Sequence, residues 1–175
     1  MSLTDIQRHV VELRTFSSGH ATFLQTILKE ILDYYGERLV GLAIFGSYAR
    51  RENTNNSDLD LLIILRGASS RRERIIEFVN EIEMKHEKMA QHLYKNEGIL
   101  IELSPYILNE SEALKLQPIY FDLVEHHNIL YDPRGIIDRI ITSTSRLLKE
   151  KGARRRRRNN TWEWQTGYFL GGIDL

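Results

Sequence analysis

The chain has 175 residues, and its 24 lysines and arginines balance its 24 aspartates and glutamates, so the formal net charge is zero. Such a balance produces no overall field that would recruit nucleic acid. The sequence contains no cysteine, which excludes disulfide bonds and thiolate-ligated zinc. No apolar run is long enough to span a bilayer, so we expect no membrane association and a cytoplasmic location. The length favours a single domain over residues 1–175.

The first elements predicted are two helices. Residues 4–14 are compatible with a short helix. Apolar residues at helical spacing then run from Leu24 to Tyr35, and Gly36 is well placed to end that second helix. Two apolar runs follow, Val40–Phe45 and Leu61–Leu65, and we interpret both as buried strands.

The segment between these strands reads GSYARRENTNNSDLD and carries most of the functional information. Side chains two apart in a strand project to the same face, so Asp58 and Asp60 are expected side by side, roughly 7 Å apart along the backbone. Two carboxylates at this spacing suit Mg²⁺, which takes oxygen ligands at about 2.1 Å and shares its coordination shell with substrate phosphates. Without a cation the two anions would repel each other. The pair therefore predicts a metal site.

The Gly-Ser pair at the start of the segment predicts a phosphate-binding turn. Gly46 lets the backbone approach a ligand without a side chain in the way. Ser47 supplies a hydroxyl, and the N–H groups of a short helix starting here would point at phosphate oxygens. Arg50, about one helical turn later, can bring its guanidinium to the same phosphates, and Arg51 is expected to face solvent.

Beyond the second strand, Ser70 and Glu73 form a predicted capping box that starts a long helix. The run Ile99–Ile107 follows and is interpreted as a strand that carries Glu102. A family resemblance, given below, implies a third acid on a later strand, and Glu102 is the candidate for it, as a metal ligand and a base for the incoming hydroxyl. With it, the site would hold two ions about 4 Å apart. The alternative is a charged residue on an exposed sheet face.

The last third of the chain predicts an edge strand, a helix and a basic segment. Asn128–Tyr131 is the edge strand, and Asp132-Pro133 is interpreted as the helix start. The five consecutive arginines Arg154–Arg158 would point all the way round a helix, so we expect a loop or an edge strand. Together with Trp162 and Trp164 they form either a phosphate-binding and base-stacking arm for RNA or a solvated turn beside packed tryptophans.

The spacing Gly46-Ser47, ten residues, Asp58-Leu59-Asp60 resembles the motif of the DNA polymerase β-type nucleotidyltransferase superfamily in its minimal (MNT) form. Gly46 and Ser47 match the phosphate-binding turn, Arg50 matches the arginine of the usual GSxARG stretch, and Asp58 and Asp60 match the first two metal ligands. One departure is that an arginine, at position 51, stands where a glycine is usual.

The resemblance implies an α/β (α+β) fold, with a mixed, twisted sheet flanked by helices. The motif core would span residues 38–107, and a helical, basic and tryptophan-containing extension would span residues 132–175. It also implies two Mg²⁺ ions and the transfer of a nucleoside monophosphate, with ATP the expected donor, onto a hydroxyl of a protein or an RNA. MNT proteins often partner a HEPN-type toxin, so the chain is a candidate antitoxin. The alternative hypothesis is a catalytically weak nucleotide-binding module that acts by protein–protein interaction.

Overall fold

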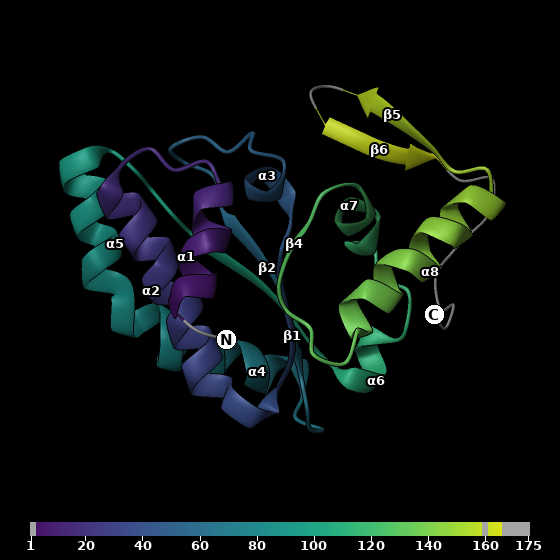
Figure 1. Cartoon of the computed structure of the whole chain (residues 1–175), viewed down its shortest axis with the longest axis horizontal. Helices are drawn as coiled ribbons and strands as arrows, with labels where there is room; N and C mark the ends of the chain where they lie inside the picture. Colours follow the sequence, from purple (N-terminus) through teal and green to yellow (C-terminus); the bar gives the residue numbers. More distant parts are fainter. Residues whose placement is uncertain (1–2, 159–160, 166–175) are drawn as a thin grey trace.

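The computed structural model describes residues 3–158 and 161–165. A four-stranded sheet lies between two groups of helices (Figure 1). The strands are β1 (Leu39–Ile44), β2 (Leu59–Leu65), β3 (Leu103–Asn109) and β4 (Asn128–Tyr131), in the spatial order β3-β2-β1-β4. Strand β1 runs antiparallel to β2 and β4, whereas β2 and β3 are parallel. The sheet is therefore mixed, as predicted.

The first helical layer covers one face of the sheet. It contains α1 (Leu3–Glu12), α2 (Ser18–Tyr35) and a long helix made of α4 (Arg71–Phe78), the π-helical segment η2 (Val79–Glu83) and α5 (Met84–Glu97). Alternation along β2 sends Leu59, Leu61 and Ile63 into this layer, where they are fully buried. The predicted capping box at Ser70 and Glu73 is present at the start of α4.

The second layer covers the opposite face and contains α6 (Glu110–Ala113), α7 (Tyr120–Glu125) and α8 (Ile136–Glu150). Leu62 and Ile64 of β2 point into it and pack with Ile137 and Ile140 of α8. Asp60 has the same parity as Leu62, so its carboxylate belongs to this face of the sheet.

The start of α8 lies later than the sequence predicts. The N-cap is Gly135 in a left-handed conformation, and not Asp132. The carboxylate of Asp132 still caps the helix, because it accepts hydrogen bonds from the backbone N–H groups of Ile136 (2.8 Å) and Asp138 (3.0 Å). Asp132 therefore caps α8 from upstream, across the tight turn that separates it from the first residue of the helix.

The remaining elements are η1 (Gly36–Arg38), α3 (Gly46–Ala49) and a hairpin of β5 (Arg154–Arg158) and β6 (Thr161–Gln165) that follows α8 (Figure 1). The basic run thus forms a strand. The side chains of residues 155–158 and 161–164, including both tryptophans, lie outside what the structure describes. Within the described helices, none combines the length and the apolar character that a membrane crossing requires.

Candidate active site

The site is built where β1 ends and the chain turns into α3, at the top of the sheet in Figure 1. The backbone N–H of Phe45 donates to the carbonyl oxygen of Asp60 at 3.1 Å, which ties the end of β1 to the start of β2. Gly46 follows with a φ of +67°, a left-handed conformation that favours glycine. The predicted short helix after the Gly-Ser pair is therefore present, and its first residue requires glycine.

Gly46 and Asp60 are in direct contact. A Cβ added to Gly46 would lie 2.9 Å from Cγ of Asp60 and closer still to Oδ2. The space next to the Gly46 backbone is thus filled by the carboxylate, which the phosphate-binding turn holds against the end of the sheet.

The carboxylate of Asp60 is half-buried, and burial raises its pKa above the ordinary value. A hydrogen bond from the Ser104 hydroxyl acts in the opposite direction, and the neighbouring charge of Asp58 raises the pKa further. Ser104 is the partner of Asp60 in the β2–β3 register, so the parallel pairing places its hydroxyl there. Asp58, one residue before β2, is exposed. The two carboxylates therefore share one charged environment, with Asp60 as its buried member.

Ser47 lies on α3, and Arg50 is the C-cap of this helix. The guanidinium of Arg50 is close enough to Asp60 to lower its pKa. It also donates from Nε to Oε2 of Glu52 at 2.9 Å. The structure thus brings Gly46, Arg50 and Asp60 close together.

Arg51 adopts a φ of +58°, the one positive φ among the non-glycine residues that the structure describes. Position 51 is where the family motif has glycine. A left-handed conformation costs an ordinary residue about 1–2 kcal/mol. The turn after the phosphate loop therefore keeps a glycine-like geometry although glycine is absent, and Arg51 faces solvent as expected.

The turn at Gly46 is fastened to the first helical layer by residues that the sequence did not single out. The backbone N–H of Phe16 donates to Nδ1 of His20 at 3.3 Å, so Nδ1 is an acceptor and the ring proton is on Nε2. Nε2 lies 3.0 Å from the hydroxyl of Tyr48, to which it donates. Both side chains are buried; burial lowers the pKa of His20 and raises the pKa of Tyr48 to about 12. This neutral pair holds α3 in place.

The structure places Glu102 just before a strand, whereas the sequence predicts it within one. Strand β3 begins at Leu103, so Ile99–Glu102 precede the strand, although the N–H of Leu59 still donates to the Glu102 carbonyl at 2.8 Å. The Glu102 side chain is exposed. Within the described part of the chain, no three carboxylate or imidazole side chains are gathered closely enough to form a metal centre.

The residues present fit Mg²⁺ that is shared with a substrate. Magnesium is usually bound by one or two carboxylates together with substrate phosphates, without a cage made entirely of protein ligands. Asp58 and Asp60 supply the two carboxylates, and a cation would offset the cost of keeping Asp60 ionised while half-buried.

Asp122 on α7 is a further charge that the sequence analysis did not find. Its carboxylate contributes to the raised pKa of Asp60. No spacing signal could have revealed it, because Asp122 reaches this region through the packing of α7 on the sheet. The sequence could have indicated Ser104, because it shares a face with Glu102 in the predicted strand over residues 99–107.

Residues 24–151 match the family model of the nucleotidyltransferase domain. The chain belongs to this family. The match confirms the enzyme class predicted from the Gly-Ser and Asp-x-Asp motif, and the mixed sheet between helices confirms the predicted fold of a nucleotidyltransferase.

This nucleotidyltransferase resembles a protein of Methanocaldococcus jannaschii named "Putative protein adenylyltransferase", with 28% identity over 112 residues, or 62% of this chain and 69% of the relative. It is also similar to the spectinomycin adenyltransferase AAD(9) of Enterococcus faecialis, solved with ATP and spectinomycin (TM-score 0.49, 13% identity, 74% of this chain and 67% of the other). A third likeness is to a chain from the complex of the tri-AMPylated Shewanella oneidensis HEPN toxin with its MNT antitoxin (TM-score 0.36, 14% identity, 74% and 92%).

Proposed function

We propose that this enzyme transfers AMP from ATP to a hydroxyl group of a protein. The observation that carries the proposal is the contact of Gly46 with Asp60, because it joins the phosphate-binding turn and a carboxylate in one site. The hydroxyl oxygen of the acceptor attacks the α-phosphorus of ATP. The bond from that phosphorus to the bridging oxygen breaks, pyrophosphate leaves, and the hydroxyl proton passes to a base.

Each residue has a distinct role in this proposal. Asp58 and Asp60 hold Mg²⁺, which neutralises charge that develops on the phosphates when it is bound. Ser47 and the turn at Gly46 bind the triphosphate. Arg50 would exchange its hydrogen bond with Glu52 for one with a phosphate. The protein would act mainly by positioning its substrates and by electrostatic stabilisation.

Glu102 enters the proposal as the ligand of a second ion. It directly precedes β3 and is exposed, so its side chain can turn towards the metal when substrate is present. The variant Glu102→Gln distinguishes the role of a second-ion ligand from the role of Asp60. Glu102→Gln should keep the Mg²⁺-dependent binding of ATP but lose about 100-fold in the rate of transfer, as expected for a general base or second-ion ligand. Equal rates in the variant and the native enzyme would remove Glu102 from the site.

A protein acceptor is favoured by the name of the relative from M. jannaschii, which describes protein adenylylation. The motif's resemblance to MNT proteins suggests a HEPN-type toxin as this acceptor, with the present chain as its antitoxin. An RNA acceptor is the weaker candidate, because the balanced net charge offers no general attraction for a polyanion.

The test uses ATP labelled either at the α- or at the γ-phosphate, with Mg²⁺, the full chain and extract of the source cells. We expect label from α-labelled ATP alone, in a band that protease removes and ribonuclease does not. Asp60→Asn should abolish it. Label that survives protease but not ribonuclease would establish RNA as the acceptor. No label above the Asp60→Asn background, despite normal ATP binding, would favour the alternative of a nucleotide-binding module that acts by protein–protein interaction.

A further inference from the structure

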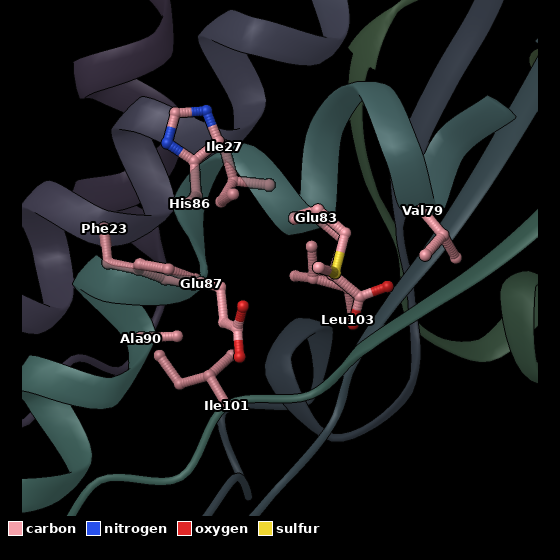
Figure 2. A pocket seen from close by; sticks show the side chains of 10 residues that line it. Phe23, Ile27, Val79, Glu83, His86, Glu87, Ala90, Ile101 and Leu103 are labelled. Atoms are coloured by element: carbon pink, nitrogen blue, oxygen red, sulfur yellow. The ribbon is translucent and has the colours of Figure 1, made fainter. Parts of the chain in front are cut away.

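A cavity lies on the sheet face opposite to that of Asp60. It has a volume of about 270 Å³ and is enclosed by α2, the η2–α5 segment and the start of β3. Its walls are largely apolar, with Phe23 and Ile27 from α2 and Ile101 and Leu103 from the β3 side (Figure 2). Glu83 and Glu87 also line it, and Figure 2 shows their carboxylates directed into the space between these walls.

The π-helical turn explains why the helix and the sheet do not close on each other here. Segment η2 interrupts the long helix at Val79–Glu83, immediately before α5. The extra residue in a π turn changes which side chains face inward, and such turns frequently occur at functional sites. Val79 lines the cavity and does not pack in the core, and beyond it the half-buried Glu83 and the exposed Glu87 also line the cavity.

Neither carboxylate forms an ion pair with a cation in the described part of the chain. Glu83 has no ion pair among the residues that the structure describes, and burial together with the charge of Glu102 raises its pKa. Glu87 accepts a hydrogen bond from the Gln91 amide at 2.9 Å, which does not neutralise it. Lys85 is engaged elsewhere, at 3.1 Å from Glu81 and 3.7 Å from Glu30.

His86 also lines the cavity, but its Nε2 lies 3.7 Å from Oε2 of Glu30. Glu30, on α2, thus lies within 4 Å of both this imidazole and the ammonium group of Lys85. The cavity itself keeps an excess of negative charge. A partly buried carboxylate with no counter-charge is costly unless a ligand supplies one.

We propose that this cavity is a binding site for a small organic ammonium ion with an apolar body. Its ammonium group would lie between Glu83 and Glu87, and its hydrocarbon part would pack on Phe23, Ile27 and Ile101. An apolar cavity of about 150 Å³ can bind benzene, so a volume of about 270 Å³ has room for a small ring with an aminomethyl substituent. This site lies on the opposite face of the sheet from Asp60, and Glu102, the proposed ligand of a second ion, is close enough for its charge to act on Glu83.

The test records amide NMR spectra of the full chain during titration with cyclohexylmethylamine. Cyclohexylmethanol, with the same shape and no charge, is the matched probe. We expect saturable shifts around η2 and Ile101 with the amine, and binding weaker by about tenfold or more with the alcohol, because a hydrogen bond to a charged group is lost. Shifts that never saturate, shifts elsewhere, or equal binding of both probes would overturn the proposal.

Variants define the groups responsible. Glu87→Gln should weaken amine binding by about tenfold, whereas Glu81→Gln, a neighbouring acid that pairs with Lys85 outside the cavity, should leave it unchanged. Ala90→Phe should fill the space and abolish binding of either probe; its spectrum also reports whether the variant is folded. If Glu87→Gln binds the amine as tightly as the native chain, the assignment is wrong.

A further titration tests whether the ligand is a free amine or the lysine side chain of a polypeptide. Nα-acetyl-lysine N-methylamide carries the same ammonium group on a polar backbone that the apolar walls do not accommodate well. We expect it to bind more weakly than cyclohexylmethylamine. Equal or tighter binding would overturn the assignment to a free amine.

Discussion

Gly46 and Asp60 are separated by thirteen residues in the chain, yet the backbone of the first rests against the carboxylate of the second. A Cβ added to Gly46 would lie only 2.9 Å from Cγ of Asp60. The glycine leaves room for the carboxylate, and the carboxylate lies where a triphosphate on the turn would bring its metal. The Gly-Ser pair and the Asp-x-Asp pair, each uninformative alone, are thus in direct contact.

Replacing Gly46 by alanine should damage both folding and nucleotide binding. The substitution places a methyl group at a φ of +67° and against Asp60. Gly98→Ala is the matched control, because Gly98 has a φ of +65° with no neighbouring atom within 4 Å of an added Cβ. We expect the control to lose about 1–2 kcal/mol of unfolding free energy and to bind ATP normally. Gly46→Ala should lose more and bind ATP at least about tenfold more weakly, measured by urea unfolding and calorimetry; equal behaviour of the two variants would contradict the contact.

Asp60→Asn should stabilise the metal-free protein at pH 7 while it abolishes transfer. The raised pKa of Asp60 means that the folded state loses stability as pH rises through that pKa. A neutral amide of the same shape avoids this loss, with an expected gain of about 0.5–1 kcal/mol. Asp58→Asn, at an exposed position, should give a smaller gain, because it removes only the repulsion of Asp60 by a neighbouring charge. Denaturant unfolding in EDTA provides the measurement, and a destabilised Asp60→Asn protein would refute the assignment of burial as the main effect.

Arg51→Gly should stabilise the protein. The φ of +58° at Arg51 is unfavourable for any residue with a Cβ and free of cost for glycine. Because glycine also gains freedom in the unfolded chain, the net gain should be about 0.5–1 kcal/mol. Thermal unfolding of the two proteins tests this. A lower melting temperature for Arg51→Gly would mean that the arginine side chain contributes more than the backbone conformation costs.

Stability should fall in mild acid because of His20. Its pKa in the folded state is lowered by burial, so below the ordinary value of 6.5 the unfolded state binds a proton that the folded state does not. Stability is therefore complete above about pH 6.5 and is lost as pH falls through the folded pKa. His20→Phe should remove this slope, at a cost of about 1 kcal/mol at pH 7.5 for the lost hydrogen bond to Tyr48, whose hydroxyl keeps its bond with Asn53. Replacing the exposed His92 should preserve the slope; a slope that also survives in His20→Phe would assign it to another group.

Most of the fold could be predicted from local patterns. The strands around the motif and the capping box at Ser70 follow from apolar runs and cap chemistry that depend on neighbouring residues. The start of α8 was misplaced because Asp132 caps across an intervening tight turn, which a search for adjacent Asp-Pro does not detect. The onset of β3 was misplaced for a related reason: Ile99 and Ile101 are apolar because they are buried, and not because they belong to the strand.

The site could be predicted in part. Gly46, Arg50 and Asp60 were identifiable because their chemistry depends on spacing within a single segment. The support of the site was not identifiable, since His20 and Tyr48 meet through the packing of α2 on α3, and Asp122 through the packing of α7. The cavity beside η2 was also hidden, because a π turn shifts the helical periodicity that reveals inward positions.

Calorimetric titration with a non-hydrolysable ATP analogue, in Mg²⁺ and in EDTA, tests the central claim most directly. If Asp58 and Asp60 hold the ion beside the triphosphate, the native chain should bind the analogue at least about tenfold more tightly with Mg²⁺, and the variant carrying both Asp58→Asn and Asp60→Asn should lose that difference. Equal affinity with and without Mg²⁺, or an unchanged difference in the double variant, would contradict the account.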